Sequence, residues 1–238
     1  MQIIKVADSK EGVQICKQLL YEMVSKNTVL FLSGGSTPKT LYEVLAKEKK
    51  LNAGAVAMVD ERYIPSSKFQ VQSSELGTNE FMIKSTHLLS FLRNLNTKFY
   101  SILQNEKMEK TASNYDETVR FLFNYFAKSV AILGVGKDGH TAGLPAGVKS
   151  LKLKTESETD LVTSFNNFPG EFKDRISLTF LGLSKLDQII VMVFGEDKKQ
   201  ALDLMFKPGS IPEIPARFLT QKEIAEKVIL ITDQEINA

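Results

Sequence analysis

The sequence alternates short, apolar, β-branched runs with longer segments whose apolar residues recur at helical spacing. The runs at 28–32, 55–59, 129–133 and 188–194 have the length of strands, and a glycine-containing or charged stretch follows each one. Runs that are apolar throughout are typical of strands buried on both faces. Strands separated by helices imply right-handed crossovers. We therefore expect an α/β fold, with an open, mainly parallel sheet and helices on both of its faces.

The same patterns predict the remaining elements. Further strands are expected at 2–6, 175–180 and 227–231, and long helices from Asp8 or Ser9 onward and over 107–127. Shorter helices are expected from Pro38 to about Ala46, from about Glu75, over 196–206 and over 216–225, with a loop over 60–74. The polar segment 149–169 gives no clear pattern. Because no repeat or Pro-, Gly- or Ser-rich linker divides the chain, we expect one domain over residues 1–238.

Composition and charge exclude several classes of protein. A chain with 43% hydrophobic and 24% charged residues is neither fibrous nor wholly disordered. The net charge of +2, without a clustered basic stripe, gives no reason to expect nucleic acid as a partner. No apolar run approaches the ~20 residues of a membrane helix, and the first residues lack a secretory pattern. We expect a cytoplasmic protein that contacts no membrane.

One cysteine and two histidines leave few residues for redox or metal chemistry. Cys16 has no partner for an intramolecular disulfide, which fits a reducing compartment, and its helical pattern favours a small core residue over a nucleophile. His87 is interpreted as a surface or helix-end residue. Zinc sites usually draw three or four ligands from Cys and His, so we expect neither a metal nor another cofactor.

Ligands of open parallel sheets bind at the carboxyl ends of the strands, so the loops there are the first candidates. Ser33–Pro38 has the sequence Ser-Gly-Gly-Ser-Thr-Pro. The glycines allow a sharp turn and a close approach to a ligand, Ser36 or Thr37 can cap the next helix, and Pro38 suits its first turn. Free N–H groups at a helix N-terminus suit a phosphate. The alternative is a tight turn with an N-cap and no ligand.

Three consecutive charges, Asp60, Glu61 and Arg62, follow another expected strand. Charges at the carboxyl end of a strand are well placed for a site. Adjacent side chains point to different sides, so not all three are expected to face one ligand. A solvated turn with a local ion pair is the alternative.

The loop Gly134–Pro145 contains a literal Gly-x-Gly-x-x-Gly, and Glu156 lies about 20 residues further on, as in dinucleotide-binding chains. That fingerprint needs a helix opening at the glycines. Gly143, Pro145 and Gly147 would interrupt such a helix, so we reject a dinucleotide site.

Asp138 stands two residues before His140 in the same loop. A carboxylate near an imidazole can orient it and favour its charged form. We interpret His140 as a general base rather than a core residue. In the last loop, Gly195–Lys199, Lys198 or Lys199 could reach a phosphate, and Arg175 is another candidate cation; a solvated run of charges is the alternative.

Taken in order, these segments resemble one family, the 6-phosphogluconolactonases, within the wider group that includes glucosamine-6-phosphate deaminase. The shared motifs are Ser33–Pro38, Asp60–Pro65, Thr78–Glu80 (at the usual Ser-Asn-Glu position), Gly134–Thr141, Arg175–Thr179 and Gly195–Leu202. They cover the chain from about residue 28 to 205. Each motif is modest alone, but the ordered set is specific because independent coincidences multiply.

The residues after His140 separate the two branches of the group. The deaminase pattern continues through Ile-Ala-Phe-Asn-Glu-Pro and supplies an acid for ring opening and isomerisation. Here the run is Thr-Ala-Gly-Leu-Pro, without Glu, and its His-Thr pair is similar to the lactonases. Gly143–Gly147 departs from the Ser-Leu-Phe-Pro usual in lactonases, which affects the wall of the pocket rather than the base.

The resemblance implies metal-independent hydrolysis of 6-phospho-D-glucono-1,5-lactone to 6-phospho-D-gluconate in the pentose phosphate pathway. It implies His140 as the base, Asp138 as its orienting carboxylate and Arg62 as the stabiliser of the developing oxyanion. The residues implied to bind the substrate or its phosphate are Gly34, Gly35, Ser36, Thr37, Asp60, Arg175 and Lys198. The implied partner is a small-molecule sugar phosphate, and we expect a monomer or a weak homodimer.

Three alternatives stay open. An amino-sugar phosphate deaminase or isomerase would share the fold, although the missing Glu argues against it. A non-enzymatic sugar-phosphate sensor would have little need of the Asp138/His140 pair, and we expect no helix-turn-helix before the first strand. A nicotinamide-dependent oxidoreductase would bind NAD, which we do not expect.

Overall fold

A parallel sheet forms the centre of the molecule. The computed structural model describes residues 1–65, 77–104, 106–147, 159–166, 168 and 171–236. In these residues seven strands pair in parallel in the order β1-β10-β9-β6-β2-β3-β5. The strands are β1 (Gln2–Lys5), β2 (Thr28–Leu32), β3 (Ala55–Met58), β5 (Lys98–Tyr100), β6 (Lys128–Gly134), β9 (Gln188–Val193) and β10 (Val228–Thr232). The expected α/β architecture is confirmed.

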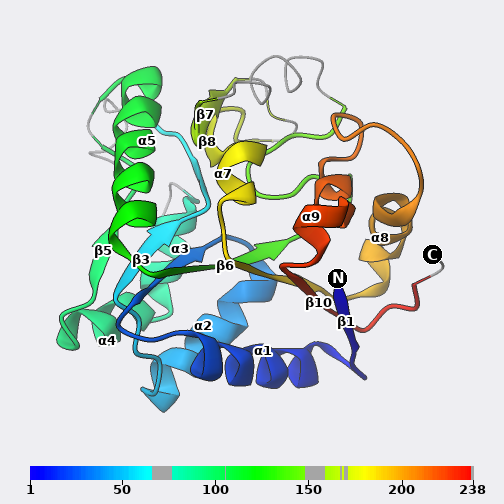
Figure 1. Cartoon of the computed structure of the whole chain (residues 1–238), viewed down its shortest axis with the longest axis horizontal. Coiled ribbons are helices and arrows are strands. Elements are labelled where there is room, and N and C mark those ends of the chain that lie inside the picture. Colours follow the sequence, from blue (N-terminus) through cyan, green and yellow to red (C-terminus); the bar gives the residue numbers. More distant parts are fainter. Residues whose placement is uncertain (66–76, 105, 148–158, 167, 169–170, 237–238) are drawn as a thin grey trace.

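Helices cover both faces of this sheet. They are α1 (Ser9–Met23), α2 (Ser36–Glu48), α3 (Asn79–Ser85), α4 (Leu88–Asn94), α5 (Met108–Tyr125), α7 (Phe180–Ser184), α8 (Lys199–Phe206) and α9 (Lys222–Ala225). Figure 1 shows α1 and α2 below the strands and α5, α7 and α9 above them. No helix in the described ranges combines the length and apolar character needed to cross a bilayer.

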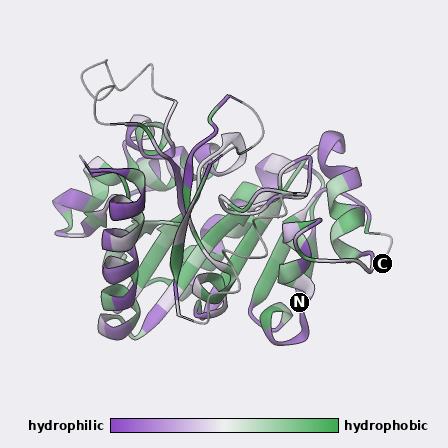
Figure 2. Ribbon diagram, turned by 90° about the horizontal axis from the view of Figure 1, so that it is seen from above, coloured by the Kyte–Doolittle hydropathy of each residue, from purple (hydrophilic) through white to green (hydrophobic). Residues whose placement is uncertain are grey.

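Three strands of the parallel sheet are buried along their whole length, as their unbroken apolar runs predict. Every residue of β2, β3 and β10 is buried. Figure 2 shows the strands of the sheet as predominantly hydrophobic, whereas the helices around them carry hydrophilic residues as well. Cys16 is fully buried in the core, as expected, and burial raises the pKa of its thiol. His87 is exposed at the N-cap of α4, also as expected.

A second, antiparallel sheet is the main departure from the sequence analysis. It contains β4 (Asp60–Arg62), β8 (Arg175–Leu178) and β7 (Val162–Phe165), in the order β4-β8-β7. Residues 60–62 were expected to be loop, and 175–180 to join the parallel sheet. The three charged residues of β4 form neither an apolar run nor an alternating pattern, so the sequence gives no sign of a strand. These residues are a strand because they pair with β8.

Several helix boundaries also differ from expectation. The helix expected from about Glu75 begins at Asn79, because the Thr78 hydroxyl caps it by accepting the Phe81 N–H at 3.1 Å. Residues 66–76, most of the expected 60–74 loop, lie outside the described ranges. The helix expected over 216–225 is a 3-10 helix, Pro215–Thr220, followed by the short α9. Likewise, 196–206 consists of a 3-10 turn and α8.

The order of the strands reverses between β2 and β6. From β2 the chain moves outward through β3 to β5, and it then returns to β6, on the other side of β2, before continuing to β9 and β10. The loops that leave the carboxyl ends of β2 and β6 therefore diverge. Such a reversal opens a crevice at the sheet edge, where ligands of this fold class bind.

Glu61 joins β4 to the start of α3. Its side chain is fully buried; Oε1 accepts the backbone N–H groups of Arg62 at 2.6 Å and Asn79 at 2.7 Å, and Oε2 accepts that of Glu80 at 2.7 Å. Burial raises the pKa of Glu61 to about 8, although the hydrogen bonds from the three N–H groups act in the opposite direction. Glu61 thus faces away from any ligand of Asp60, as the alternation of side chains predicted.

The Glu61→Gln variant should be less stable than the wild type by about 1–3 kcal/mol, because one amide –NH₂ must then face a backbone N–H that needs an acceptor. Both oxygens of a carboxyl group can accept whether or not it is ionised, so the loss is expected in either protonation state. Urea unfolding measures it. Exposed Glu223→Gln, on α9, is the matched control and should stay within about 0.5 kcal/mol of the wild type. Equal stabilities of the two variants would contradict this role of Glu61.

Candidate active site

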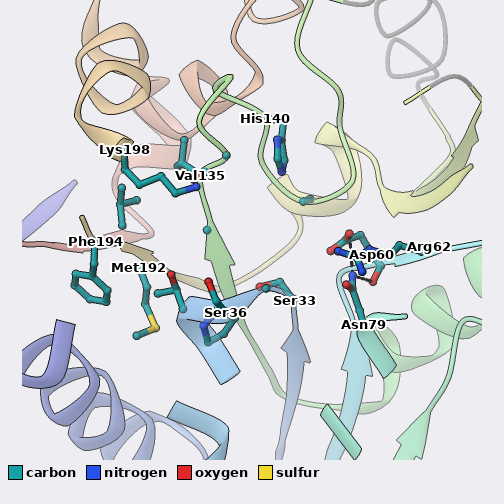
Figure 3. Close-up of a pocket in the computed structure, with 18 of the residues that line it drawn as sticks. Ser33, Ser36, Asp60, Arg62, Asn79, Val135, His140, Met192, Phe194 and Lys198 are labelled. Atoms are coloured by element: carbon teal, nitrogen blue, oxygen red, sulfur yellow. Dashed lines mark hydrogen bonds between the residues drawn. The ribbon is translucent and has the colours of Figure 1, made fainter. Parts of the chain in front are cut away.

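A cleft opens at the carboxyl edge of the parallel sheet, between the loops that follow β2 and β6 (Figure 3). Its lining comprises Ser33–Pro38, Asp60, Arg62, Asn79, Gly134, Val135, Gly136, His140, Ala142, Phe168, Arg175, Met192, Val193, Phe194 and Lys198. Every residue predicted from the sequence to act at the site is in this lining except Asp138. Segments more than 100 residues apart in the chain thus meet in one place.

Asp138 lies behind His140 and binds it. The distance from Asp138 Oδ1 to His140 Nδ1 is 2.6 Å, and the His140 backbone N–H donates to the same oxygen at 3.1 Å. With Nδ1 held by the carboxylate, Nε2 remains for other partners. Burial alone would raise the pKa of Asp138, but the hydrogen bond and charge of His140 lower it to about 2. The geometry is that of an oriented, solvent-accessible base, because the imidazole side chain is 34% exposed.

The glycines of this loop make room for the Asp138–His140 pair. A Cβ on Gly136 would lie 2.0 Å from His140 Nδ1 and 2.7 Å from Asp138 Oδ1. Gly139 has a φ of +85°, which allows the chain to turn back on itself. The Thr141 hydroxyl closes the loop by donating to Gly134 O at 2.9 Å. No helix occurs within residues 134–147, as Gly143, Pro145 and Gly147 predicted.

The turn after β2 presents an uncapped helix N-terminus to the cleft. Gly35, with a φ of +106°, occupies the N-cap of α2, and no side chain caps the helix. The expectation that Ser36 or Thr37 is the cap is therefore wrong: both lie in the first turn, and the glycine conformation starts the helix one residue earlier. The free N–H groups at the start of this 13-residue helix suit an anion.

Lys198 faces the same end of the cleft from the loop after β9. Its Nζ donates to Val135 O at 3.0 Å, and burial lowers its pKa. The neighbouring Lys199 instead donates to Glu235 O at 2.9 Å and is absent from the lining. Of the two lysines left open by the sequence analysis, Lys198 is thus the one at the site.

Arg62 and Arg175 stand at the other end, directly opposite each other in the register of β4 and β8. Burial lowers the pKa of Arg175, and the charge of Asp60 opposes that effect. Asp60 is buried and accepts the Asn79 amide on Oδ2 at 3.1 Å. Burial raises the pKa of Asp60, whereas the charges of Arg175 and His140 lower it.

Several lining residues had no assigned role in the sequence analysis, among them Asn79, Phe168 and Ser33. Asn79 belongs to the Thr-Asn-Glu motif, which was the available signal, and Gly34 is required because its Cβ would lie 2.0 Å from Asn79 Oδ1. Phe168 falls in the segment that gave no pattern. Ser33 ends a buried run, and its hydroxyl is buried without a hydrogen-bond partner. Within the described ranges, no three His, Cys, Asp or Glu side chains are grouped to hold a metal ion.

The Gly136→Ala variant should raise the pKa of Asp138 from about 2 toward its ordinary 3.8, because the new methyl group displaces the imidazole that lowers it. Carboxyl ¹³C spectra between pH 6 and pH 3 test this: the wild-type Asp138 resonance should hardly move, and that of the variant should move over most of its range. Gly134→Ala is the control, since the nearest atom to its Cβ would be 3.8 Å away. An Asp138 resonance that stays fixed in Gly136→Ala would show that the pair does not depend on this glycine.

The chain is similar to known proteins of one family. The family model for glucosamine-6-phosphate isomerases/6-phosphogluconolactonase matches residues 10–230. A 6-phosphogluconolactonase of Chlamydia pneumoniae is 32% identical over 180 residues, 74% of this chain and 63% of that protein, so the match spans less than two thirds of that relative. A glucosamine-6-phosphate deaminase of Ligilactobacillus salivarius is 26% identical over 99% of this chain and 97% of its own.

The fold is similar to that of solved members of the group. The structure of a 6-phosphogluconolactonase from Plasmodium vivax superposes with a TM-score of 0.76 over 99% of this chain and 91% of that one, at 17% identity. The match of the family model covers nearly the whole chain and includes both the helix N-terminus and the histidine loop. The chain belongs to the glucosamine-6-phosphate isomerase/6-phosphogluconolactonase family.

Proposed function

We propose that this protein hydrolyses 6-phospho-D-glucono-1,5-lactone to 6-phospho-D-gluconate. The observation that carries the proposal is the presence, in one cleft, of a carboxylate-oriented histidine and an uncapped helix N-terminus beside a lysine. The first suits a water-activating base and the second a phosphate. The 6-phosphogluconolactonases among its relatives support the same substrate.

The phosphate is assigned to the turn Gly34–Thr37 and to Lys198. The N–H groups of the first turn of α2 are unused by any cap, and Lys198 is partly desolvated, so a dianion there would satisfy both. Binding the phosphate at this end would hold the lactone ring toward His140. Binding energy from a remote group is then used to position the reacting carbon.

His140 is assigned as general base and then general acid. Nε2 takes a proton from water as the water oxygen bonds to C1 of the lactone. The tetrahedral intermediate collapses with cleavage of the bond between C1 and the ring oxygen, and Nε2 returns the proton to that oxygen. Asp138 keeps Nδ1 hydrogen-bonded and stabilises the imidazolium formed between the two transfers.

Arg62 is assigned to the oxyanion that develops on the C1 carbonyl, and Arg175, its neighbour across β4 and β8, supports the same negative charge. Donors fixed before the reaction contribute ~10²–10³ each to turnover. Asp60, held by Asn79, is assigned to a sugar hydroxyl as acceptor. Since a lactone is an activated ester, these groups are sufficient without a metal ion.

A glucosamine-6-phosphate deaminase is the second candidate, because a deaminase matches over nearly the whole chain. The loop after His140 contains no acid up to Pro145, and the acidic side chain in the described lining is Asp60. Ammonia released from glucosamine 6-phosphate, with no lactone hydrolysis above the spontaneous rate, would favour the deaminase. Lactone hydrolysis without ammonia would establish the lactonase.

The His140→Ala variant should lower kcat at least ~10²-fold on fresh 6-phosphogluconolactone, because a positioned base contributes that much, with little change in thermal stability. The spontaneous rate must be subtracted. His87→Asn is the matched control: this exposed histidine has a φ of +63°, which Asn tolerates, and its activity should equal that of the wild type. Wild-type turnover by His140→Ala would remove His140 as the base.

The Lys198→Ala variant should mainly raise KM for the phosphorylated lactone and change hydrolysis of D-glucono-1,5-lactone, which has no phosphate, much less. The reason is that Lys198 is assigned to the phosphate alone. Lys199→Ala, whose Nζ is bound to Glu235 O, serves as control. If Lys198→Ala weakened hydrolysis of both lactones equally, Lys198 would be assigned to the reacting end instead of the phosphate. If Arg175→Ala weakened hydrolysis of the phosphorylated lactone alone, Arg175 would be assigned to the phosphate.

A further inference from the structure

We propose that Phe168 and Phe172, on the connection between β7 and β8, are positioning residues that hold the two active-site arginines in place, and that Phe168 also fixes His140 relative to Arg175. The proposal deepens the proposed function and rests on it for its kinetic consequence. Neither phenylalanine belongs to a motif recognised in the sequence. Both lie among the described residues of this connection, 166, 168 and 171–174.

Arg62 and Arg175 need such support because they are like charges at directly opposed positions. They are Cα partners in the antiparallel pairing of β4 with β8. Like charges opposed in this way repel, and the charge of Arg62 contributes to the lowering of the Arg175 pKa. The Nε atoms of both side chains are buried without a hydrogen-bond partner. Hydrogen bonds at Nε therefore do not orient either guanidinium.

Aromatic faces provide the missing orientation. Cζ of Arg62 lies 4.5 Å from the ring centroid of Phe172, and Cζ of Arg175 lies 4.6 Å from that of Phe168. A guanidinium over a ring is attracted by the negative face of the ring. Each arginine of the pair thus has one ring, and both rings come from the same connection. Arg62 Nη1 additionally donates to Gly77 O.

Phe168 contacts the base as well as the cation. Its ring centroid is 5.5 Å from that of His140, with an angle of 82° between the planes, an edge-to-face contact. Phe168 is 6% exposed and lines the cleft. One side chain therefore touches both Arg175, at the reacting end, and His140. Its ring sets the separation between the group that moves the proton and a cation assigned to the oxyanion.

The two rings are themselves fixed. The backbone N–H of Phe168 donates to Lys173 O at 2.7 Å, which closes the connection just before β8. Phe172 packs on Gly77: a Cβ there would lie 2.6 Å from its ring. Rigid support of this kind is what a preorganised site requires, since a misplacement of about 1 Å can cost ~10²-fold in rate.

The kinetic test compares Phe168→Leu with Phe172→Leu, Phe168→Tyr and Phe123→Leu. Phe168→Leu keeps an apolar side chain but removes the ring, and should lower kcat ~10-fold or more with a smaller change in KM, because base and cation both lose their support. Phe172→Leu should lower kcat less, since it affects Arg62 alone. Phe168→Tyr keeps the ring face and should restore kcat. Phe123, on α5, packs on Phe31 away from the cleft, so Phe123→Leu controls for lost aromatic packing.

A second measurement does not depend on turnover, and its first part uses the wild type alone. In ¹H–¹⁵N spectra of the wild type, the Nε–H signals of Arg62 and Arg175 should be displaced from the free-arginine position by the rings beneath them. Phe168→Leu should move the Arg175 signal and the His140 ring protons, and Phe172→Leu the Arg62 signal.

The two measurements separate the two proposals. Undisplaced arginine signals in the wild type, or an unchanged kcat in Phe168→Leu, would overturn the positioning role while leaving lactonase activity standing. Displaced signals in a protein that does not hydrolyse the lactone would support the positioning role and overturn the proposed function.

Discussion

The side-by-side parallel pairing of β2 with β6 is the constraint on which the rest of the site depends. Residues 28–31 pair with 128–131, although about 100 positions separate them, so both strands end at the same edge of the sheet. The chain leaves β2 in one direction and β6 in the other, which keeps their loops apart. The register of the two strands therefore places the N-terminus of α2 and the histidine loop at the same edge of the sheet.

The small antiparallel sheet places charged side chains at the cleft, whereas the strands of the parallel sheet are largely buried and apolar. Consecutive side chains of β4 point to opposite sides of the strand. Glu61 is buried against backbone N–H groups of α3, whereas Asp60 and Arg62 face the cleft. Pairing with β8 then adds Arg175 beside Arg62. Two cations and one carboxylate in a partly buried site attract an anion more strongly than the same groups would in water. The cost is mutual repulsion, which the stacked phenylalanines offset.

The sequence predicted the structure where the outcome depends on residues that are close together in the chain. Unbroken apolar runs predicted the buried strands, and the spacing of Asp138 and His140 predicted their contact, because both effects are local. It was uninformative for β4, where three charged residues become a strand only through pairing with a segment more than 110 positions away. Phe168 was missed for the same reason: nothing near it in the chain indicates that a guanidinium and an imidazole will lie against its ring. The cap of α2 was misassigned because the conformation of Gly35, rather than a hydroxyl, starts that helix.

The Gly-x-Gly-x-x-Gly sequence in the histidine loop shows why a motif needs its physical reason. In a dinucleotide site, glycines let the backbone approach a pyrophosphate at the start of a helix. Here Gly136 leaves the space that Asp138 and His140 occupy, and Gly139 supplies the positive φ that turns the chain back. The same glycine spacing therefore serves two different steric requirements, close approach to a pyrophosphate in one case and room for two side chains in the other. What distinguishes them in the sequence is the segment that follows, where glycines and a proline prevent a helix and the loop closes through Thr141.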